Sequence, residues 1–301
     1  MQACASSTSY SNPTVYDIAF SFRDFEAEAA FLMEAHASVR QDPMKSFLEV
    51  GCGPARHTLL LAEAGIQECV GIDASSEMIN YARETAQAMG LDDKVKFALA
   101  DMTDPAGFHA ALTEKVDGAA IMLGTLSHCL DNASAIQTLH NIAECVKVGG
   151  VLVVELGHPR DIFQGSFCSD GFVECWEVSE SGEVDFAEDE SDSEDDDQNE
   201  DPSPAKDELR VMVEYGREGD CFDVDRQILH RTVGMSLFDP DATLLSSNVE
   251  TVQQRQFTLQ EMDLLAKATG WEVASVWGDL SFDVPLDADE AYRMVVILKR
   301  N

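Results

Sequence analysis

The stretch of sequence that decides the fold is FLEVGCGPARH, residues 47–57. It begins with a short, mainly apolar run that predicts a buried strand. Gly51 and Gly53 end this run, and residues 56–64 resume with helical character. A strand, a glycine-rich turn and a helix in this order are typical of a loop that binds a nucleotide-type cofactor. Glycine lets the backbone approach a ligand closely, and the free N–H groups at the helix start favour an anion. Taken alone, the pattern also fits an ordinary turn.

Acidic residues stand at the ends of the next two strands. Residues 69–73 (CVGID) predict a second strand that ends in Asp73, roughly twenty residues after the glycines, where a Rossmann-like unit binds ribose. A carboxylate suits this position because it can accept hydrogen bonds from both ribose hydroxyls. Residues 95–100 predict the third strand, which leads directly to Asp101 and Met102.

Five motifs in order and spacing resemble the class I S-adenosylmethionine-dependent methyltransferases, over residues 46–159. They are LEVGCGPARH (48–57), VGIDASSEMINYAR (70–83), FALADMTD (97–104), DGAAIMLGTLSHCL (117–130) and VGGVLVVELGHP (148–159). The competing interpretation is a dinucleotide dehydrogenase, but that family requires a third glycine where this chain has Arg56. It also leaves the third and fourth motifs unexplained.

The resemblance implies an α/β fold with a Rossmann-like, seven-stranded, mostly parallel sheet, an antiparallel last strand and helices on both faces. Near the end of the chain, Thr258 and Glu261 have the spacing of a capping box that starts a helix. Residues 273–277 and 293–299 then predict strands six and seven, and in the resembled fold strand seven lies between strands five and six.

An insertion is expected before that helix, because residues 161–239 replace the alternation of helices and strands with runs rich in Val, Phe and Tyr. We expect an antiparallel β cap that packs above the cofactor, as similar insertions do in the resembled family. Residues 15–160 and 240–301 are assigned to the methyltransferase domain. Residues 1–14 show neither a signal nor a transit pattern and are assigned to a flexible tail.

The cap contains an acidic run. Residues 183–201 hold twelve acids and no Lys or Arg. Such a segment repels itself and buries little apolar area, so we expect a disordered loop at about 180–208. Ser191 and Ser193 lie among these acids, as substrates of acid-directed kinases do, although a loop that merely interacts with solvent explains the run equally simply.

The resemblance implies which residues hold the cofactor. In the resembled family the acid at the position of Asp101 holds the adenine amino group, and the residue after it supplies a backbone N–H and an apolar wall. The candidates are Glu49, Gly51, Cys52, Gly53, Arg56, Asp73, Ala74, Met78, Asp101, Met102, Leu123 and Gly124.

Catalytic residues are harder to assign, because methyl transfer mainly requires alignment and exclusion of water. A general base is needed only for a protonated acceptor. His128 lies where an acceptor would be presented and can remove a proton near neutral pH, or it can be structural. The candidates, in order, are His128, His158, Glu155 and Tyr16.

The acceptor is expected to contact Tyr16, Arg23 and His128. Residues 16–35 carry apolar side chains at helical spacing, and the pair Tyr16–Asp17 resembles the start of many small-molecule methyltransferases, where this segment folds over the cofactor. Arg23 is suited to bind an acceptor carboxylate, or to pair with a nearby acid such as Glu26.

Charge and cysteine content limit the partners. The formal net charge is −36, from 56 acidic and 20 basic residues. Nucleic acids and anionic membranes need basic surfaces, so neither is an expected partner. The eight cysteines have no metal-binding spacing, which indicates reduced thiols, no metal site and a cytoplasmic location.

The leading interpretation is therefore an S-adenosylmethionine-dependent methyltransferase that acts on a small molecule by in-line displacement. One alternative is a protein methyltransferase in which the acidic loop steers a basic polypeptide. Another is a cofactor-binding regulatory subunit without activity, although the intact glycines and acids of the motifs argue against it. The sequence defines neither the acceptor nor the oligomeric state.

Overall fold

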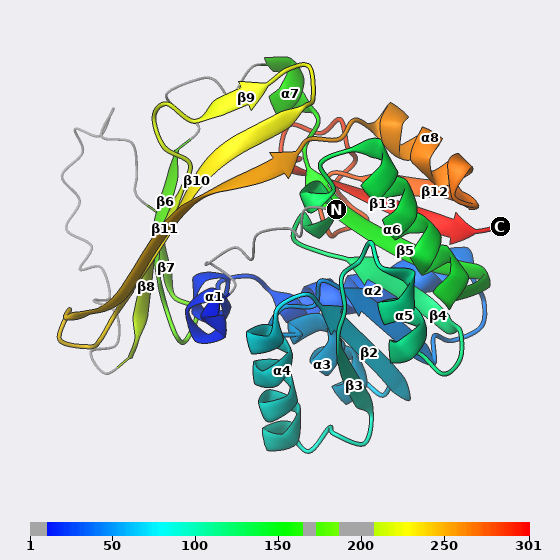
Figure 1. Ribbon diagram of the computed structural model, residues 1–301. Helices are drawn as coiled ribbons and strands as arrows, with labels where there is room; N and C mark the ends of the chain where they lie inside the picture. The colour runs from blue at the N-terminus through cyan, green and yellow to red at the C-terminus, as the bar shows by residue number, and fades with distance from the viewer. Residues whose placement is uncertain (1–10, 165–172, 187–207) are drawn as a thin grey trace.

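Two β-sheets organise the chain (Figure 1). The computed structural model describes residues 11–164, 173–186 and 208–301. The larger sheet has the strand order β12-β13-β5-β4-β1-β2-β3. Its strands are β1 (Ser46–Val50), β2 (Glu68–Asp73), β3 (Val95–Leu99), β4 (Val116–Ile121), β5 (Val146–Gly157), β12 (Trp271–Trp277) and β13 (Arg293–Arg300). Strands β1 to β5 pair in parallel, and β13 runs antiparallel between β5 and β12. The predicted Rossmann-like sheet is confirmed.

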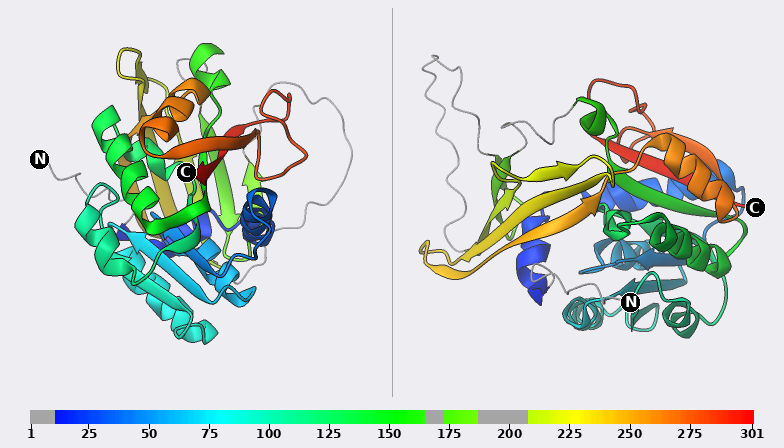
Figure 2. Two further views of the ribbon diagram at one scale, coloured as in Figure 1. Left: turned by 90° about the vertical axis from the view of Figure 1, so that its right-hand side faces the viewer. Right: turned by 45° about the horizontal axis from the view of Figure 1, so that its top comes forward.

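Helices cover both faces of this sheet (Figure 2). They are α2 (Phe25–Val39), α3 (Arg56–Glu63), α4 (Ser76–Met89), α5 (Pro105–Ala111), α6 (Asn132–Cys145) and α8 (Leu259–Ala268). Helices α2, α3 and α4 share one apolar cluster with the sheet, and α5, α6 and α8 share the other. A central sheet whose two faces are both covered explains why its strands read as nearly continuous apolar runs.

Short helices and caps shape the ends of these elements. The predicted capping box at Thr258 and Glu261 is present at the start of α8. The helical spacing of residues 16–35 is divided between α1 (Pro13–Ala19) and α2, because Asp24 caps the start of α2 by accepting the N–H of Ala27. Two further short elements are η2 (Thr125–His128) and α7 (Arg160–Gln164).

The second sheet is antiparallel, with the order β11-β10-β8-β6-β7 and β9 beside β10. Its strands are β6 (Glu174–Ser179), β7 (Val184–Phe186), β8 (Arg210–Tyr215), β9 (Cys221–Asp223), β10 (Ile228–Phe238) and β11 (Leu244–Arg255). The insertion therefore extends to Arg255, beyond the boundary at residue 239 drawn from the sequence. The sequence of β11, LLSSNVETVQQR, is mostly polar, and only its long pairing with β10 shows where it belongs.

Helix α1 packs on the inner face of this second sheet and also contacts α4 (Figure 1). Val15 and Ile18 lie in one apolar cluster with Trp176 and Val213. The indole Nε1 of Trp176 donates a hydrogen bond of 3.0 Å to the carbonyl of Ala19. The N-terminal helix is thus joined to the cap although about 160 residues separate them in sequence.

Some of the segments for which the sequence makes predictions lie outside the described residues. They are residues 1–10 of the expected tail and most of the acidic loop, which includes Ser191 and Ser193. Within the described ranges, no helix has both the length and the apolarity needed to cross a membrane.

The variant Trp176→Phe keeps an aromatic ring but loses the bond to Ala19. Because a buried hydrogen bond contributes about 1 kcal/mol, we expect a decrease of that size in the free energy of unfolding, measured with urea, and faster amide exchange in α1. The control Trp271→Phe removes a similar bond, to the Leu139 carbonyl in the larger sheet's domain. Equal exchange of α1 in both variants would show that Trp176 does not hold this helix.

Candidate active site

The glycine-rich loop after β1 has the tight geometry that its sequence predicts. Gly51 and Gly53 have φ angles of 69° and 50°, in the left-handed region where glycine is favoured. A Cβ atom at Gly51 would collide with the methyl group of Thr125. The N–H groups of Gly51 and Cys52 both donate to the carbonyl of Ile72, at 2.8 and 3.0 Å, which holds the loop against β2. The loop is therefore fixed by its neighbours on both sides.

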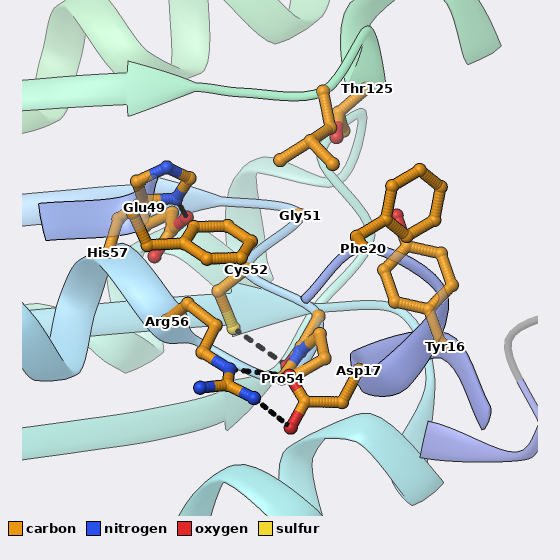
Figure 3. A pocket seen from close by; sticks show the side chains of 13 residues that line it. Tyr16, Asp17, Phe20, Glu49, Gly51, Cys52, Pro54, Arg56, His57 and Thr125 are labelled. Atoms are coloured by element: carbon orange, nitrogen blue, oxygen red, sulfur yellow. Dashed lines mark hydrogen bonds and ion pairs between the residues drawn. The ribbon is translucent and has the colours of Figure 1, made fainter. Parts of the chain in front are cut away.

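A pocket lies over this loop and under helix α1 (Figure 3). Its empty volume is about 410 Å³, part of which is open to the solvent. Its lining includes seven residues expected from the sequence: Tyr16, Glu49, Gly51, Cys52, Gly53, Arg56 and Leu123. The others are Asp17, Phe20, Phe25, Pro54, His57 and Thr125, which sequence reasoning did not single out as site residues. The signals that could have found them were the pair Tyr16–Asp17 for Asp17 and the first and fourth motifs, which contain Pro54, His57 and Thr125.

Asp73 joins the glycine loop to the end of β2. One carboxylate oxygen accepts the N–H of Gly53 at 2.9 Å, and the other accepts the N–H of Ser75 at 2.8 Å. Burial raises the pKa of Asp73, and these backbone donors act in the opposite direction. Each carboxylate oxygen has a further lone pair, so the group can still accept hydrogen bonds from a ligand.

The other expected cofactor residues lie at the same sheet edge but outside the pocket lining. Asp101 is exposed and accepts the N–H and the hydroxyl of Thr103, at 2.8 and 2.7 Å. Leu99, which pairs with Asp73 in the sheet, is 59% exposed and gives this edge an apolar surface that the sequence analysis missed. The remaining members are Ala74, which is exposed, Met78, which is buried in the core, and Met102 and Gly124, which are partly buried.

Asp17 fastens helix α1 to helices α3 and α4 beside the pocket. Its carboxylate receives two bonds from Arg56 at the start of α3, of 2.6 and 2.8 Å (Figure 3). The hydroxyl of Tyr81 on α4 donates a third, of 2.8 Å. A bidentate Arg–carboxylate pair fixes orientation as well as distance. Arg56 thus borders the pocket but is already paired.

Glu49 is held beneath the loop by a buried histidine. The two ring nitrogens of His57 lie 2.9 Å from Glu49 and 2.8 Å from Glu28. Glu49 also accepts the backbone N–H of Thr58 at 3.0 Å. Burial disfavours the charged imidazole, but Glu49 and Glu28 outweigh it and raise the pKa of His57 to about 9. A charged His57 donates from both nitrogens and so neutralises part of this carboxylate cluster.

Glu155, at the end of β5, is occupied by structural partners. It accepts hydrogen bonds from Arg23 at 3.1 Å, from Arg293 at 2.7 Å and from the N–H of Leu123 at 2.8 Å. Burial raises its pKa, but the two arginines prevail and lower it. This arrangement argues against Glu155 as a general base. Arg23 also pairs with Glu28 at 2.8 Å, so it is committed to protein carboxylates and not directed at an acceptor.

The two histidine candidates differ. His158 is buried, with Nε2 2.8 Å from the Leu286 carbonyl and Nδ1 accepting the N–H of Arg160 at 3.0 Å. This assigns the proton to Nε2 and occupies both nitrogens, which argues against a base. His128, at the end of η2, has its pKa lowered by burial. Its imidazole is therefore neutral at pH 7 and able to accept a proton.

Tyr16 extends from α1 toward the loop. Its ring lies 4.8 Å from that of Phe20, and a Cβ atom at Gly53 would be 3.9 Å from it. Burial raises the pKa of Tyr16, and Tyr215 and Asp73 add to this effect. The phenol therefore remains protonated near neutral pH and is suited to positioning an acceptor by hydrogen bonding.

Comparison with known proteins agrees with this geometry. Residues 47–150 match the family model described as "Methyltransferase domain". The chain contains a methyltransferase domain. The matched segment begins in β1, before the glycine loop, and ends in β5, so it includes Asp73, Asp101 and His128.

Two solved structures share the whole fold. An S-adenosylmethionine-dependent methyltransferase from Clostridium acetobutylicum has a TM-score of 0.66 at 15% identity, covering 95% of this chain and 96% of that one. The sugar N-methyltransferase KedS8 from Streptoalloteichus has a TM-score of 0.63 at 20% identity, covering 100% of both chains. The predicted class I fold of the methyltransferase domain is thus confirmed.

A curated relative matches a smaller part. The 23S rRNA (uracil(1939)-C(5))-methyltransferase RlmD of Acidithiobacillus ferrooxidans is 34% identical over 77 residues, 26% of this chain. The matched segment spans only 17% of that relative's length. The likeness therefore concerns part of one domain.

The buried cluster around His57 predicts a pH dependence of stability. The pKa of His57 is raised from 6.5 to about 9 in the folded protein. The charged imidazole therefore stabilises the fold fully below pH 6.5, and this stabilisation is lost as the pH rises through about 9. His57→Gln should remove this loss from the urea-unfolding free energies measured between pH 6 and pH 10. His140→Gln, an exposed change on α6, is the control and should retain it. If the unfolding free energy of the wild type varies with pH in the same way as that of His57→Gln over this range, His57 is not charged in the folded protein.

Proposed function

We propose that this protein is an S-adenosylmethionine-dependent methyltransferase that acts on a small-molecule acceptor. The observation that carries the proposal is the bond from the N–H of Gly53 to Asp73, which brings the glycine loop and the acid at the end of β2 into one site. This is the arrangement expected for a ligand that has both a ribose and a charged tail.

The residues present suit this cofactor. Asp73 would accept hydrogen bonds from the ribose hydroxyls, since both its oxygens retain lone pairs. Asp101, Leu99 and Met102 would hold the adenine with an exposed carboxylate and an apolar surface. The glycine loop would lie against the amino-acid part, because Gly51 and Gly53 line the pocket and add no side chain to it.

When bound, the cofactor supplies a methyl group on a sulfonium, and transfer to an acceptor lone pair returns the electrons of the broken C–S bond to sulfur. The chain's own contribution is to orient the acceptor and exclude water. Tyr16 and α1 cover the loop for this purpose. His128, which is neutral at pH 7, would accept the acceptor's proton where one must be lost.

A small acceptor fits the chain better than a macromolecule. The second sheet and α1 form one apolar cluster beside the pocket, so a long substrate has less access there. The formal net charge of −36 disfavours nucleic acid, which basic surfaces bind. KedS8, a neighbour in fold, is named as a sugar N-methyltransferase. The free, buried thiols of Cys52, Cys69, Cys129 and Cys145 support a cytoplasmic location.

Asp73→Asn tests the cofactor site. A hydrogen bond to a charged group contributes about 1.5–3 kcal/mol, so calorimetric titration should show S-adenosylmethionine binding at least about ten-fold weaker than in the wild type. Asp92→Asn, an exposed change in the turn before β3, should bind normally. If neither S-adenosylmethionine nor S-adenosylhomocysteine binds to the wild type, the proposed function is overturned.

His128→Asn tests the proposed base. Loss of a general base lowers kcat by about 10²–10⁴-fold, while cofactor affinity should stay at the wild-type value. Wild-type turnover of metabolites from a protein-free extract should fall below pH 6.5, as the imidazole becomes protonated. Unchanged kcat and an unchanged pH profile in the variant would remove His128 from the mechanism.

A further inference from the structure

Strand β11 forms one edge of the second sheet. It is twelve residues long and pairs with β10 on one side. Among the residues that the structure describes, no strand pairs with its other side, here called the outer edge. The hairpin of β10 and β11 projects away from the larger sheet (Figures 1 and 2), and only the carboxyl end of β11 is bonded to that domain, from Arg255 to Asn132.

The backbone groups of β11 alternate between its two sides. The N–H of Gly216, just after β8, donates to the carbonyl of Thr232 on β10. The even-numbered residues of β10 therefore bond to β8, and its odd-numbered residues bond to β11. Val233 is opposite Glu250, so the even-numbered residues of β11 bond to β10. The N–H and C=O groups of the odd-numbered residues 247–253 consequently point to the outer edge.

The side chains along this edge do not oppose strand pairing. Residues 246–252 read SSNVETV, with one acid and no Lys, Arg or Pro. Edge strands are normally protected by charged side chains, Pro, bulges or short length. The bulge in β11 lies at its amino end, opposite Leu237 and Phe238, and leaves residues 246–252 in regular register. Val249, in the middle of this stretch, is 51% exposed.

The opposite edge of the same sheet is protected. It is formed by β7, which is only three residues long. Strand β7 lies within the acidic run of residues 183–201, so a second copy of this acidic chain would meet like charge there. One edge is thus short and acidic, whereas the other is long and nearly neutral. This contrast indicates that the outer edge of β11 has a partner strand.

The sequence of β11 is complementary to itself. When two copies of residues 246–252 run antiparallel with Val249 opposite Val249, Ser247 is opposite Thr251 and Asn248 is opposite Glu250. Pairs of β-branched residues and Ser–Thr pairs stabilise neighbouring antiparallel strands. Each acid is opposite an amide, so no like charges face each other. The residues at 247, 249 and 251 are also those whose backbone groups point outward, so they form the hydrogen-bonded pairs.

We propose that two copies of this chain associate through β11, antiparallel about a two-fold axis at Val249, and join their second sheets into one continuous sheet. Such a contact uses the same surface on both copies and covers both outer edges, so the assembly ends at two chains. One strand pair is small compared with a standard interface, and we expect a dissociation constant of roughly 1–100 µM. This pairing does not depend on the proposed function.

Sedimentation equilibrium of the full chain should show a mass that rises with concentration from 32.9 kDa toward twice this value. Val249→Lys should raise the dissociation constant by about ten-fold or more, because like charges opposite each other destabilise a strand pair. Val249→Pro should have a similar effect without adding charge. It removes an N–H that points outward, and Pro is tolerated at such a position of an edge strand.

The matched control is Val148→Lys, which adds the same charge at a valine of β5 that is 74% exposed. It should dimerise as the wild type does. Circular dichroism and thermal unfolding should show that all three variants are folded under the conditions of the experiment. A wild type that stays monomeric up to about 100 µM, assemblies larger than two chains, or Val249 variants that dimerise as Val148→Lys does would each overturn the proposal.

Disulfide formation tests the register. In a Cys221→Ser background, which removes an exposed thiol, Val249→Cys should join two chains on oxidation. Opposite residues in a hydrogen-bonded antiparallel pair have Cα atoms about 5.5 Å apart, which suits a disulfide. Gln253→Cys lies on the same edge but opposite Leu245, so it should form no more cross-link than the parent. Equal cross-linking of the two variants would contradict a two-fold axis at Val249.

Ionic strength distinguishes this interface from one held by ion pairs. Each chain has a formal net charge of −36, so two copies repel each other. Raising the salt concentration from about 0.05 to 0.5 M screens this repulsion and should lower the dissociation constant of the dimer. A dissociation constant that rises with salt would show that ion pairs hold the two copies together, and pairing through β11 would then be wrong.

Discussion

The buried carboxylate of Glu155 joins four parts of the chain on which the site depends. It lies at the end of β5, accepts the N–H of Leu123 before η2, and pairs with Arg23 and with Arg293 of β13. A buried carboxylate is strongly unfavourable unless it is both paired and hydrogen-bonded. The four segments therefore have to meet in this arrangement, and the turn before His128 is set by the same group that anchors the segment after α1.

A second carboxylate cluster supports the glycine loop from below. Glu49 and Glu28 share the imidazole of His57, so β1, α2 and α3 are tied together under the pocket. Arg23 links the two clusters, because it contacts both Glu28 and Glu155. The floor of the pocket and the loop that carries His128 are consequently parts of one ionic network, and a change in one is expected to reach the other.

Helix α1 connects this network to the second sheet. Asp17 pairs with Arg56 on the domain side, and Ala19 accepts a bond from Trp176 on the cap side. The larger sheet's domain and the second sheet are therefore joined through one short helix. Tyr16 lies on that helix and lines the pocket, so in the proposed function one segment would both cover the cofactor and position an acceptor.

The sequence by itself determined the sheet, the glycine loop and the acids at the strand ends. These features are local: periodicity defines a strand or helix, and an acid that ends a parallel strand must lie at the sheet's carboxyl edge. It could not determine the roles of Glu155, His158 and Arg23, because each of them has a partner more than 100 residues away in sequence. It also missed the extent of the second sheet, since the polar strand β11 is defined by pairing with β10 and not by its own pattern. Only tertiary structure decided which charged side chains are committed to one another and which face a ligand, because burial and pairing depend on contacts between distant segments.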